Sequence, residues 1–375
     1  MAAALAFSWL ALTVHFNYAG NWTGLFCTGD RFAAPPPALS AEHIYLFRNS
    51  FGYDGQMYHY MAHDPFLKRG FLSSLDAPRF RYRRILLPLA AWLLATGRDQ
   101  FVDAAYYALV CLSVFMGTLW VGAVAVKQGR AAAWALGFLA VPGVAVSLDR
   151  MTVDLALAAL TAGLVHYLKR QNWGAVFVIC LLASLVRESG LLLAAGVAGW
   201  LVLQRRLAGA VLIALSAAPA FAWFAYIDQR TPVNPAELLS VVPFAGLASR
   251  IAAPVQYPFG IAMNTLATVL DYAALAGIAV AVIYCLRHFR RLVQLPEGMV
   301  AFAFVALVAF VATPAAWQEA YAFARGYSPL ILIVGLDGMS ATPFEAAAPL
   351  VLTAPRIALQ LGGQVLGIVR GLAGF

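Results

Sequence analysis

Charged side chains are scarce in this chain. Only 11% of its 375 residues are Asp, Glu, Lys or Arg, whereas soluble globular proteins have about 25%. Hydrophobic residues make up 62% of the chain, and the mean hydropathy is +0.78. This balance excludes an ordinary soluble domain and indicates a polytopic membrane protein. We attribute the net charge of +8 to helix orientation and to contacts with anionic lipid or phosphate. No pattern typical of a nucleic-acid-binding module accompanies it.

Cysteine is also rare. Cys27, Cys111, Cys180 and Cys285 are scattered, and three of them lie in apolar runs. Because no C-x-x-C or similar spacing occurs, we expect no disulfide and no zinc site. The chain also shows no P-loop and no G-x-G-x-x-G motif in a strand–helix context.

The N-terminus lacks the basic residues that begin a secretory signal peptide, and no clear cleavage site follows its apolar run. We therefore expect this run to stay as the first membrane span. Further apolar runs of near-spanning length follow it, and together they predict about ten transmembrane helices. These runs are residues 2–19, 101–126, 131–148, 152–168, 172–187, 189–203, 207–227, 258–286, 298–316 and 326–340.

One apolar run, Leu86 to Thr96, is too short to cross a bilayer. If it does not cross and the first span runs outward, the basic clusters all fall in cytoplasmic loops, as the positive-inside rule requires. We therefore interpret this run as a half-helix or a juxtamembrane helix. The cytoplasmic clusters are Lys127/Arg130, Lys169/Arg170, Arg205/Arg206 and Arg287/Arg290/Arg291.

This topology gathers the remaining polar residues on the outer side, although they come from distant parts of the sequence. Ionisable residues at span ends are costly and usually line a cavity or a pathway, so we expect a shared outer cavity. The alternative is that they are solvated loop charges. They are Asp54, Asp64, Asp76, Arg79 to Arg84, Asp149, Arg150, Asp154, Arg187, Glu188, Asp228, Arg230, Glu237, Glu319 and Arg325.

A polar and aromatic island from Phe51 to Pro88 interrupts the apolar chain. Tyr53-Asp54-Gly55-Gln56 is typical of a turn that leads into a short helix, in which Asp54 is either an N-cap or a functional carboxylate. His59 and His63 are four residues apart, so one helical face presents both. With Asp54 or Asp64 they would suit a divalent metal such as Mg or Mn; the alternative is a pair of interfacial histidines.

Four arginines then occur within six residues, interleaved with Phe80 and Tyr82, on the side where the positive-inside rule disfavours them. Arginine binds phosphate in a bidentate manner, and the aromatic rings suit stacking on a sugar or an isoprenoid. The alternative is a row of arginines against anionic headgroups. The four are Arg79, Arg81, Arg83 and Arg84.

The island reads YDGQxYxxxAxDPF followed by DxPxxRYRRILLPLxAW, and this pattern resembles the first loop of bacterial glycosyltransferases of the GT-C superfamily. The resemblance covers about a tenth of the chain. It implies an all-α membrane fold of about ten helices, with juxtamembrane helices in a long first extracytoplasmic loop. It implies one transmembrane domain at 1–340, whose first loop is residues 20–100. The loop lacks the paired acids of many such enzymes, because Tyr53 and Gly55 flank Asp54.

The resemblance also implies an activity: sugar transfer from a polyprenyl-phosphate-linked donor to a lipid, glycan or protein hydroxyl, outside the cytoplasm, with Asp54 as general base. It places the protein in a bacterial inner membrane. The expected phosphate-binding residues are Arg79, Arg81, Arg83, Arg84, Arg187 and Arg325. The expected cavity residues are Tyr53, Gln56, Tyr58, His59, His63, Asp64, Asp149, Arg150, Asp154 and Glu188.

Two other functions fit the same sequence. A transporter or flippase of a lipid-linked substrate is one, although charge within its spans is sparse, with Asp271 and Asp337 as the candidates. A non-catalytic membrane assembly subunit is the other.

Residues 341–375 form a separate C-terminal segment, in which we expect prolines to break the chain and an amphipathic helix to begin at Pro355 on the cytoplasmic surface. A further short span is the alternative there.

Overall fold

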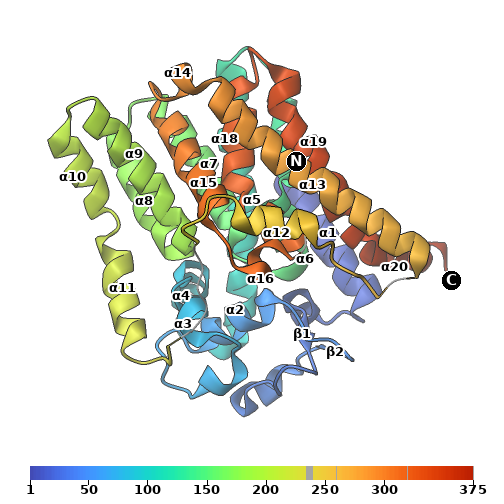
Figure 1. The fold of residues 1–375 in the computed structure, drawn as a ribbon. Coiled ribbons are helices and arrows are strands. Elements are labelled where there is room, and N and C mark those ends of the chain that lie inside the picture. The colour runs from blue at the N-terminus through green and yellow to red at the C-terminus, as the bar shows by residue number, and fades with distance from the viewer. Residues whose placement is uncertain (234–239, 259, 319, 375) are drawn as a thin grey trace.

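The computed structural model describes residues 1–233, 240–258, 260–318 and 320–374. These residues are mostly helical, which confirms the predicted all-α class in outline (Figure 1). The described strands are β1 (Thr28–Gly29) and β2 (Leu46–Phe47), which pair in parallel, with Thr28 opposite Leu46. Proline stands in the first turn of several helices, α3, α6, α15 and α18 among them, where its missing N–H removes no helical hydrogen bond.

The first half of the chain builds the loop region and one side of the bundle (Figure 1). Its helices are α1 (Ala2–Asn17), η1 (Trp22–Phe26), η2 (Pro37–Glu42), α2 (Asp54–His63), η3 (Phe71–Ser74), α3 (Pro78–Tyr82), α4 (Leu86–Leu94), α5 (Asp99–Lys127), η4 (Ala132–Ala140), α6 (Pro142–Arg150), α7 (Asp154–Leu168), α8 (Trp173–Val186), η5 (Glu188–Gly190) and α9 (Leu191–Leu203).

The second half completes the bundle and ends in a helix that packs on α1. Its helices are α10 (Leu207–Leu215), α11 (Ala218–Asp228), α12 (Ala245–Ala252), α13 (Ile261–Arg287), α14 (Phe289–Leu292), α15 (Pro296–Phe310), α16 (Pro314–Trp317), α17 (Ala320–Gly326), α18 (Ser328–Gly338), α19 (Pro343–Gln360) and α20 (Gly362–Ala373).

Among the described residues, three helical stretches are long and apolar enough to cross a membrane: Asp99–Lys127, Leu207–Asp228 and Ile261–Arg287. A fourth candidate joins η4 and α6, which meet at a bend of 62°. In the same described part of the chain, six more apolar helices, between 10 and 17 residues long, overlap the other predicted runs. The structure therefore supports a membrane protein, while the count of ten spans stays a prediction.

The short run after the arginines forms α4, a helix of nine residues. It stops because Thr96 (φ 53°) and Gly97 (φ 72°) take left-handed backbone conformations, after which α5 starts at Asp99. At about 1.5 Å per residue, α4 is about 13 Å long, less than half of a bilayer's apolar thickness. The helix turns the chain back onto α5, against which it packs.

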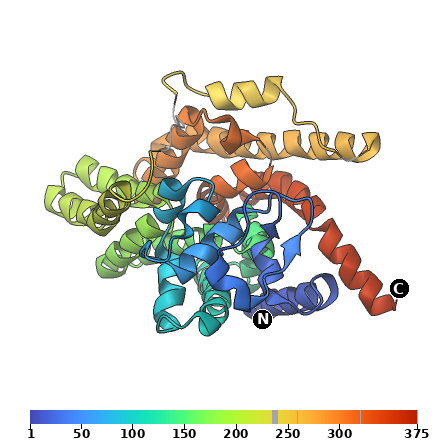
Figure 2. The ribbon, with the colours of Figure 1, turned by 90° about the horizontal axis from the view of Figure 1, so that it is seen from below.

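The segment between α1 and α5 lies at one end of the bundle, and the view from below shows it laid across the helix ends (Figure 2). The basic clusters gather at the other end, where α14 lies (Figure 1). There Lys127 donates a hydrogen bond to the carbonyl of Lys169, and Lys169 pairs with Glu297. The assignment of this end to the cytoplasmic side stays a prediction.

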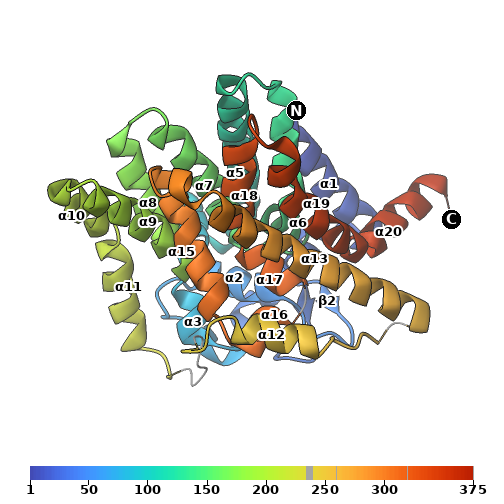
Figure 3. The same cartoon turned by 45° about the horizontal axis from the view of Figure 1, so that its top comes forward.

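The C-terminal segment differs from its predicted form. α19 begins at Pro343 and continues through Pro349 and Pro355, so these prolines do not break the chain. The helix packs along α13 and α18, and Figure 3 shows α13 crossing in front of it. This tertiary packing outweighs the cost of the two internal prolines. α20 then packs on α1, where Asn17 donates to the carbonyl of Gln364.

Candidate functional site

Asp54 is the first residue of α2, and its side chain does not cap that helix. The N-cap position belongs to Tyr53, and no side-chain capping bond is formed there. The first turn of α2 lies against the C-terminus of α6. The approach is so close that a Cβ on Gly55 would sit 2.1 Å from the carbonyl oxygen of Arg150. Only glycine permits this approach. The interpretation of Asp54 as a simple N-cap is therefore wrong.

Two arginines that are distant in the sequence form ion pairs with the Asp54 carboxylate. Nη1 of Arg81 lies 2.9 Å from Oδ1, and Nη2 of Arg325 lies 2.7 Å from Oδ2. Arg81 lies in α3 and Arg325 lies in α17. Each carboxylate oxygen therefore pairs with a guanidinium from a different helix. Arg81 also forms a two-point pair with Asp76, with contacts of 2.8 and 2.6 Å. The Asp54 side chain is 15% exposed.

The charged network continues into the bundle through residues at the ends of α7 and α8. Nε of Arg325 lies 3.4 Å from Oδ2 of Asp154, and Arg187 pairs with the other oxygen of Asp154. Asp154 begins α7, and Arg187 caps the C-terminus of α8. The loop and three bundle helices therefore meet at one set of carboxylates and guanidiniums.

A second pair flanks this network. Arg84 donates to Glu188 at 3.0 Å and to the hydroxyl of Tyr58 at 3.2 Å. The guanidinium of Arg84 also lies over the Phe80 ring, 3.9 Å from its centroid. We name the set Asp54, Arg81, Arg84, Asp154, Arg187, Glu188 and Arg325 the arginine–carboxylate cluster.

Electrostatics fix the ionisation of Asp54. Burial opposes its charged form, but the attraction of Arg325, Arg81 and Arg84 outweighs burial and holds the pKa of the carboxyl well below its usual range. The N-terminus of α2 adds a favourable partial positive charge. Some buried atoms nevertheless have no hydrogen-bond partner within the described residues, namely Nη1 of Arg325 and Oε1 of Glu188. Such orphaned donors and acceptors are typical of a site that takes a polar ligand.

The predicted row of arginines divides into two faces. Arg81 and Arg84 belong to the cluster, whereas Arg83 donates to both oxygens of Asp228 at 2.8 and 2.9 Å. Arg79 lies on the same side, where it donates to the carbonyls of Asp228 and Thr231. This division follows helical spacing, because residues four apart share a face. Arg79 and Arg83 thus tie the loop to α11, and their binding of phosphate stays a prediction.

Other predicted cavity residues are engaged in local structure. Gln56 accepts from the backbone of Gly29 and donates to that of Phe51. Asp64 accepts from the N–H groups of Lys68 and Arg69 at 2.7 and 2.8 Å, which closes the turn after α2. Both side chains therefore hold the loop in shape.

Tyr53, Asp149 and Arg150 lie on the α6 and α17 side of the cluster. The ring of Tyr53 faces the guanidinium of Arg325 at 5.2 Å. Asp149 pairs with Nε of Arg150 at 2.9 Å and accepts from the hydroxyl of Tyr321 at 3.2 Å. This buried pair neighbours the cluster through Tyr321, whose ring contacts that of Tyr53.

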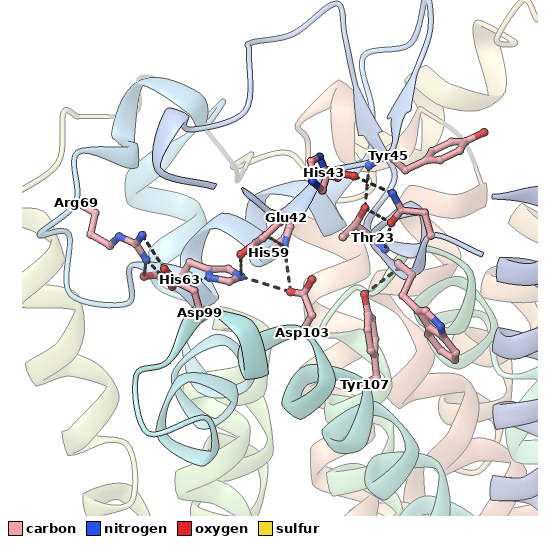
Figure 4. Close-up of polar contacts among 12 residues, drawn as sticks. Thr23, Glu42, His43, Tyr45, His59, His63, Arg69, Asp99, Asp103 and Tyr107 are labelled. Atoms are coloured by element: carbon pink, nitrogen blue, oxygen red, sulfur yellow. Dashed lines mark hydrogen bonds and ion pairs between the residues drawn. The ribbon is translucent and has the colours of Figure 1, made fainter. Parts of the chain in front are cut away.

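His59 and His63 do share one face of α2, as predicted, but their carboxylate partners are neither Asp54 nor Asp64. Glu42, at the end of η2, and Asp103, in α5, approach both rings (Figure 4). Burial opposes protonation of His59, but the charges of Asp103 and Glu42 outweigh it and raise the pKa of the imidazole to about 9.

Sequence reasoning missed the carboxylate partners of His59 and His63. Asp99 and Asp103 repeat the four-residue spacing of His59 and His63, and this match was the available signal. Glu42 lies in a stretch with no helical periodicity, so nothing local marks it. Two members of the predicted outer set, Glu237 and Glu319, lie outside the described residues.

No known protein family, curated protein or solved structure matches this chain.

Proposed function

We propose that the chain is a membrane glycosyltransferase that moves a sugar from a polyprenyl-phosphate-linked donor to an acceptor hydroxyl on the extracytoplasmic side. The observation that carries the proposal is the arginine–carboxylate cluster. One carboxylate, Asp54, stands between two guanidiniums at the end of the bundle opposite the basic clusters. A phosphate leaving group needs positive charge, an acceptor hydroxyl needs a base, and the cluster offers both.

The proposed reaction is a displacement at the anomeric carbon of the donor. The acceptor oxygen forms the new glycosidic bond as its proton passes to Asp54. The bond between the anomeric carbon and the phosphate oxygen breaks, and its electron pair stays on the phosphate. Polyprenyl phosphate leaves as a monoester with one more negative charge than the donor carried. Arg81 and Arg325 stabilise that charge through charge-assisted hydrogen bonds.

The depressed pKa of Asp54 requires one further step. A carboxylate held by two arginines is a weak base, whereas an effective general base has a pKa nearer to the operating pH. The donor phosphate competes with Asp54 for these arginines. When the phosphate takes one guanidinium, Asp54 loses part of its stabilisation and its pKa rises. Donor binding thus prepares the base, and the carboxylate stays inactive without donor.

Arg84 and Arg187 have supporting roles in this proposal. Each is bound to its own carboxylate, Glu188 or Asp154, and these pairs keep the positive charges of the site in fixed positions. The Phe80 ring under Arg84 limits its freedom further. We assign both as positioning residues, while Arg81 and Arg325 contact the substrate phosphate.

Transfer is tested in proteoliposomes that contain the full chain, labelled undecaprenyl-phosphate hexoses and pentoses, and a bacterial lipid extract as acceptor. The expected product is free undecaprenyl phosphate together with labelled acceptor. Movement of the labelled lipid across the bilayer without release of undecaprenyl phosphate would refute transfer and favour a transporter. Binding of the labelled lipid without release or movement would favour an assembly subunit.

A further inference from the structure

Four side chains meet beside the arginine–carboxylate cluster without taking part in it. Glu42, His59, His63 and Asp103 come from η2, α2 and α5, and one ligand atom from each lies within 4.8 Å of the others (Figure 4). We infer that they form a structural site for a divalent transition metal, Zn²⁺ in the first place. The two imidazole nitrogens and two carboxylate oxygens match the ligands that zinc accepts.

The spacing of these atoms fits tetrahedral coordination. With metal–ligand bonds of about 2.0–2.2 Å, neighbouring ligand atoms in a tetrahedron lie about 3.3–3.6 Å apart. Nε2 of His59 lies 3.2 Å from Glu42 and 3.0 Å from Asp103. Nε2 of His63 lies 3.2 and 3.4 Å from the same two carboxylates. Both distances to Asp103 end at Oδ1, whereas the distances to Glu42 end at Oε2 for His59 and at Oε1 for His63. Each separation is therefore close to the edge length of such a tetrahedron, and Glu42 turns both of its oxygens toward the site.

The ring of His59 and the carboxylate of Glu42 make ion-pair contacts that lack hydrogen-bond geometry. His59 is fully buried, and neither ring nitrogen has a hydrogen-bond partner within the described residues; the same holds for both oxygens of Glu42. A buried imidazole without a hydrogen bond is costly. Lone pairs that converge on a shared cation remove this cost, because the nitrogen and the oxygens then bind a third atom and not each other.

His63 carries a second feature of metal sites. Its other ring nitrogen, Nδ1, lies 2.9 Å from Oδ1 of Asp99. Asp99 is itself held by two bonds from Arg69, at 2.7 and 2.9 Å (Figure 4). Metal-binding histidines usually donate their second N–H to a carboxylate, which fixes the ring and the tautomer. Asp99 supplies this carboxylate and leaves Nε2 of His63 directed at Glu42 and Asp103.

Charge and access also fit a dication. Metal binding displaces the protons of the imidazoles, and with both rings neutral the two carboxylates leave a charge of −2, which one divalent ion neutralises. A surface cavity of about 620 Å³ is lined by Glu42, Asp99 and Asp103, so an ion can reach the site from outside. Zinc bound there would join η2, α2 and α5. It would fix the helix on which Asp54 stands, without a bond to Asp54 itself. The inference does not depend on the proposed sugar transfer.

The test uses the full chain without a polyhistidine tag, purified in nanodiscs, stripped with EDTA and dialysed against buffered Zn²⁺. We expect one zinc per chain by elemental analysis, and we expect Zn²⁺ to raise the melting temperature of the stripped wild type. X-ray absorption should give four nitrogen or oxygen neighbours at about 2.0–2.2 Å, two of them imidazoles. Less than half an equivalent of zinc at micromolar free Zn²⁺, or sulfur among its neighbours, would overturn the inference.

Two variants locate the ion. His59→Gln should weaken zinc binding at least 100-fold, whereas His43→Gln, a control at an exposed neighbouring histidine, should bind as the wild type does. Equal affinities of the two variants would place the zinc elsewhere and refute the site. If His59→Gln does not fold, the response of the stripped wild type to Zn²⁺ decides. The alternative, a metal-free network of protonated histidines, predicts no uptake and no thermal shift in that wild type. Uptake of Mn²⁺ but not Zn²⁺ would refute the assignment of zinc.

Discussion

Asp54→Asn separates the chemical role of this carboxylate from its structural one. The substitution keeps the size of the side chain and removes its charge and its basicity. Loss of a general base lowers a rate about 10²- to 10⁴-fold, which corresponds to about 2.7–5.5 kcal/mol of activation free energy. We expect kcat for sugar transfer to fall by this amount in proteoliposomes.

Asp54→Asn should lower the free energy of unfolding by less than the removal of one partner from an isolated buried ion pair does. Removing one partner of a buried pair costs about 3–5 kcal/mol. Arg81 keeps Asp76, and Arg325 keeps Asp154, so neither guanidinium is left without a carboxylate. We therefore expect the free energy of unfolding to fall by about 3 kcal/mol or less. The variant should remain folded, which makes its loss of activity interpretable.

Asp228→Asn is the matched control for this experiment. It removes a carboxylate from an arginine pair of the same loop, that of Arg83, but outside the cluster. Asp228 is 37% exposed, so its pair contributes about 0–1 kcal/mol. We expect Asp228→Asn to transfer sugar at nearly the wild-type rate. Wild-type turnover by Asp54→Asn, or an equal loss in both variants, would refute the role of Asp54 as the base.

Further predictions concern the same site. Arg81→Ala should raise KM for the polyprenyl-phosphate donor at least 10-fold, because it removes a charge-assisted phosphate contact; Arg79→Ala should leave KM within threefold, and equal effects would contradict the division of the arginine row. Because the folded pKa of Asp54 is lowered, its charge stabilises the fold above the unfolded pKa of about 4, and this contribution is lost as the pH falls further. The melting temperatures of wild type and Asp54→Asn should therefore differ by a constant amount from pH 5 to 8 and converge below about pH 4; a difference that changes between pH 5 and 8 would show that another group controls it. Gly55→Ala should cost about 1–3 kcal/mol of unfolding free energy, because its Cβ would meet a backbone carbonyl at 2.1 Å, whereas Gly137→Ala has open space and should not destabilise the fold in a thermal melt.

The sequence determined the class of the protein and the material of its site. Apolar composition and spaced runs predicted a helical membrane protein, and the helices follow those runs because burial in lipid leaves a chain few other ways to satisfy its backbone. The charged residues that the sequence singled out at span ends, such as Asp154 and Arg187, do meet Asp54 and Arg325. They meet because ionisable groups in an apolar chain are stable only beside opposite charge.

Only the tertiary structure decided which charges pair. Arg81 pairs with Asp54 and Arg83 pairs with Asp228, although only Tyr82 separates the two arginines, because α3 and its C-cap direct residues two apart to different sides. The tertiary structure also brought Glu42 and Asp103 to the histidines of α2 across separations of up to 44 residues in the chain. Cysteine spacing alone gives no sign of the proposed zinc site. The matching four-residue spacings of Asp99/Asp103 and His59/His63 show which residues share a helical face, but packing and not periodicity sets the distance between the elements that carry them.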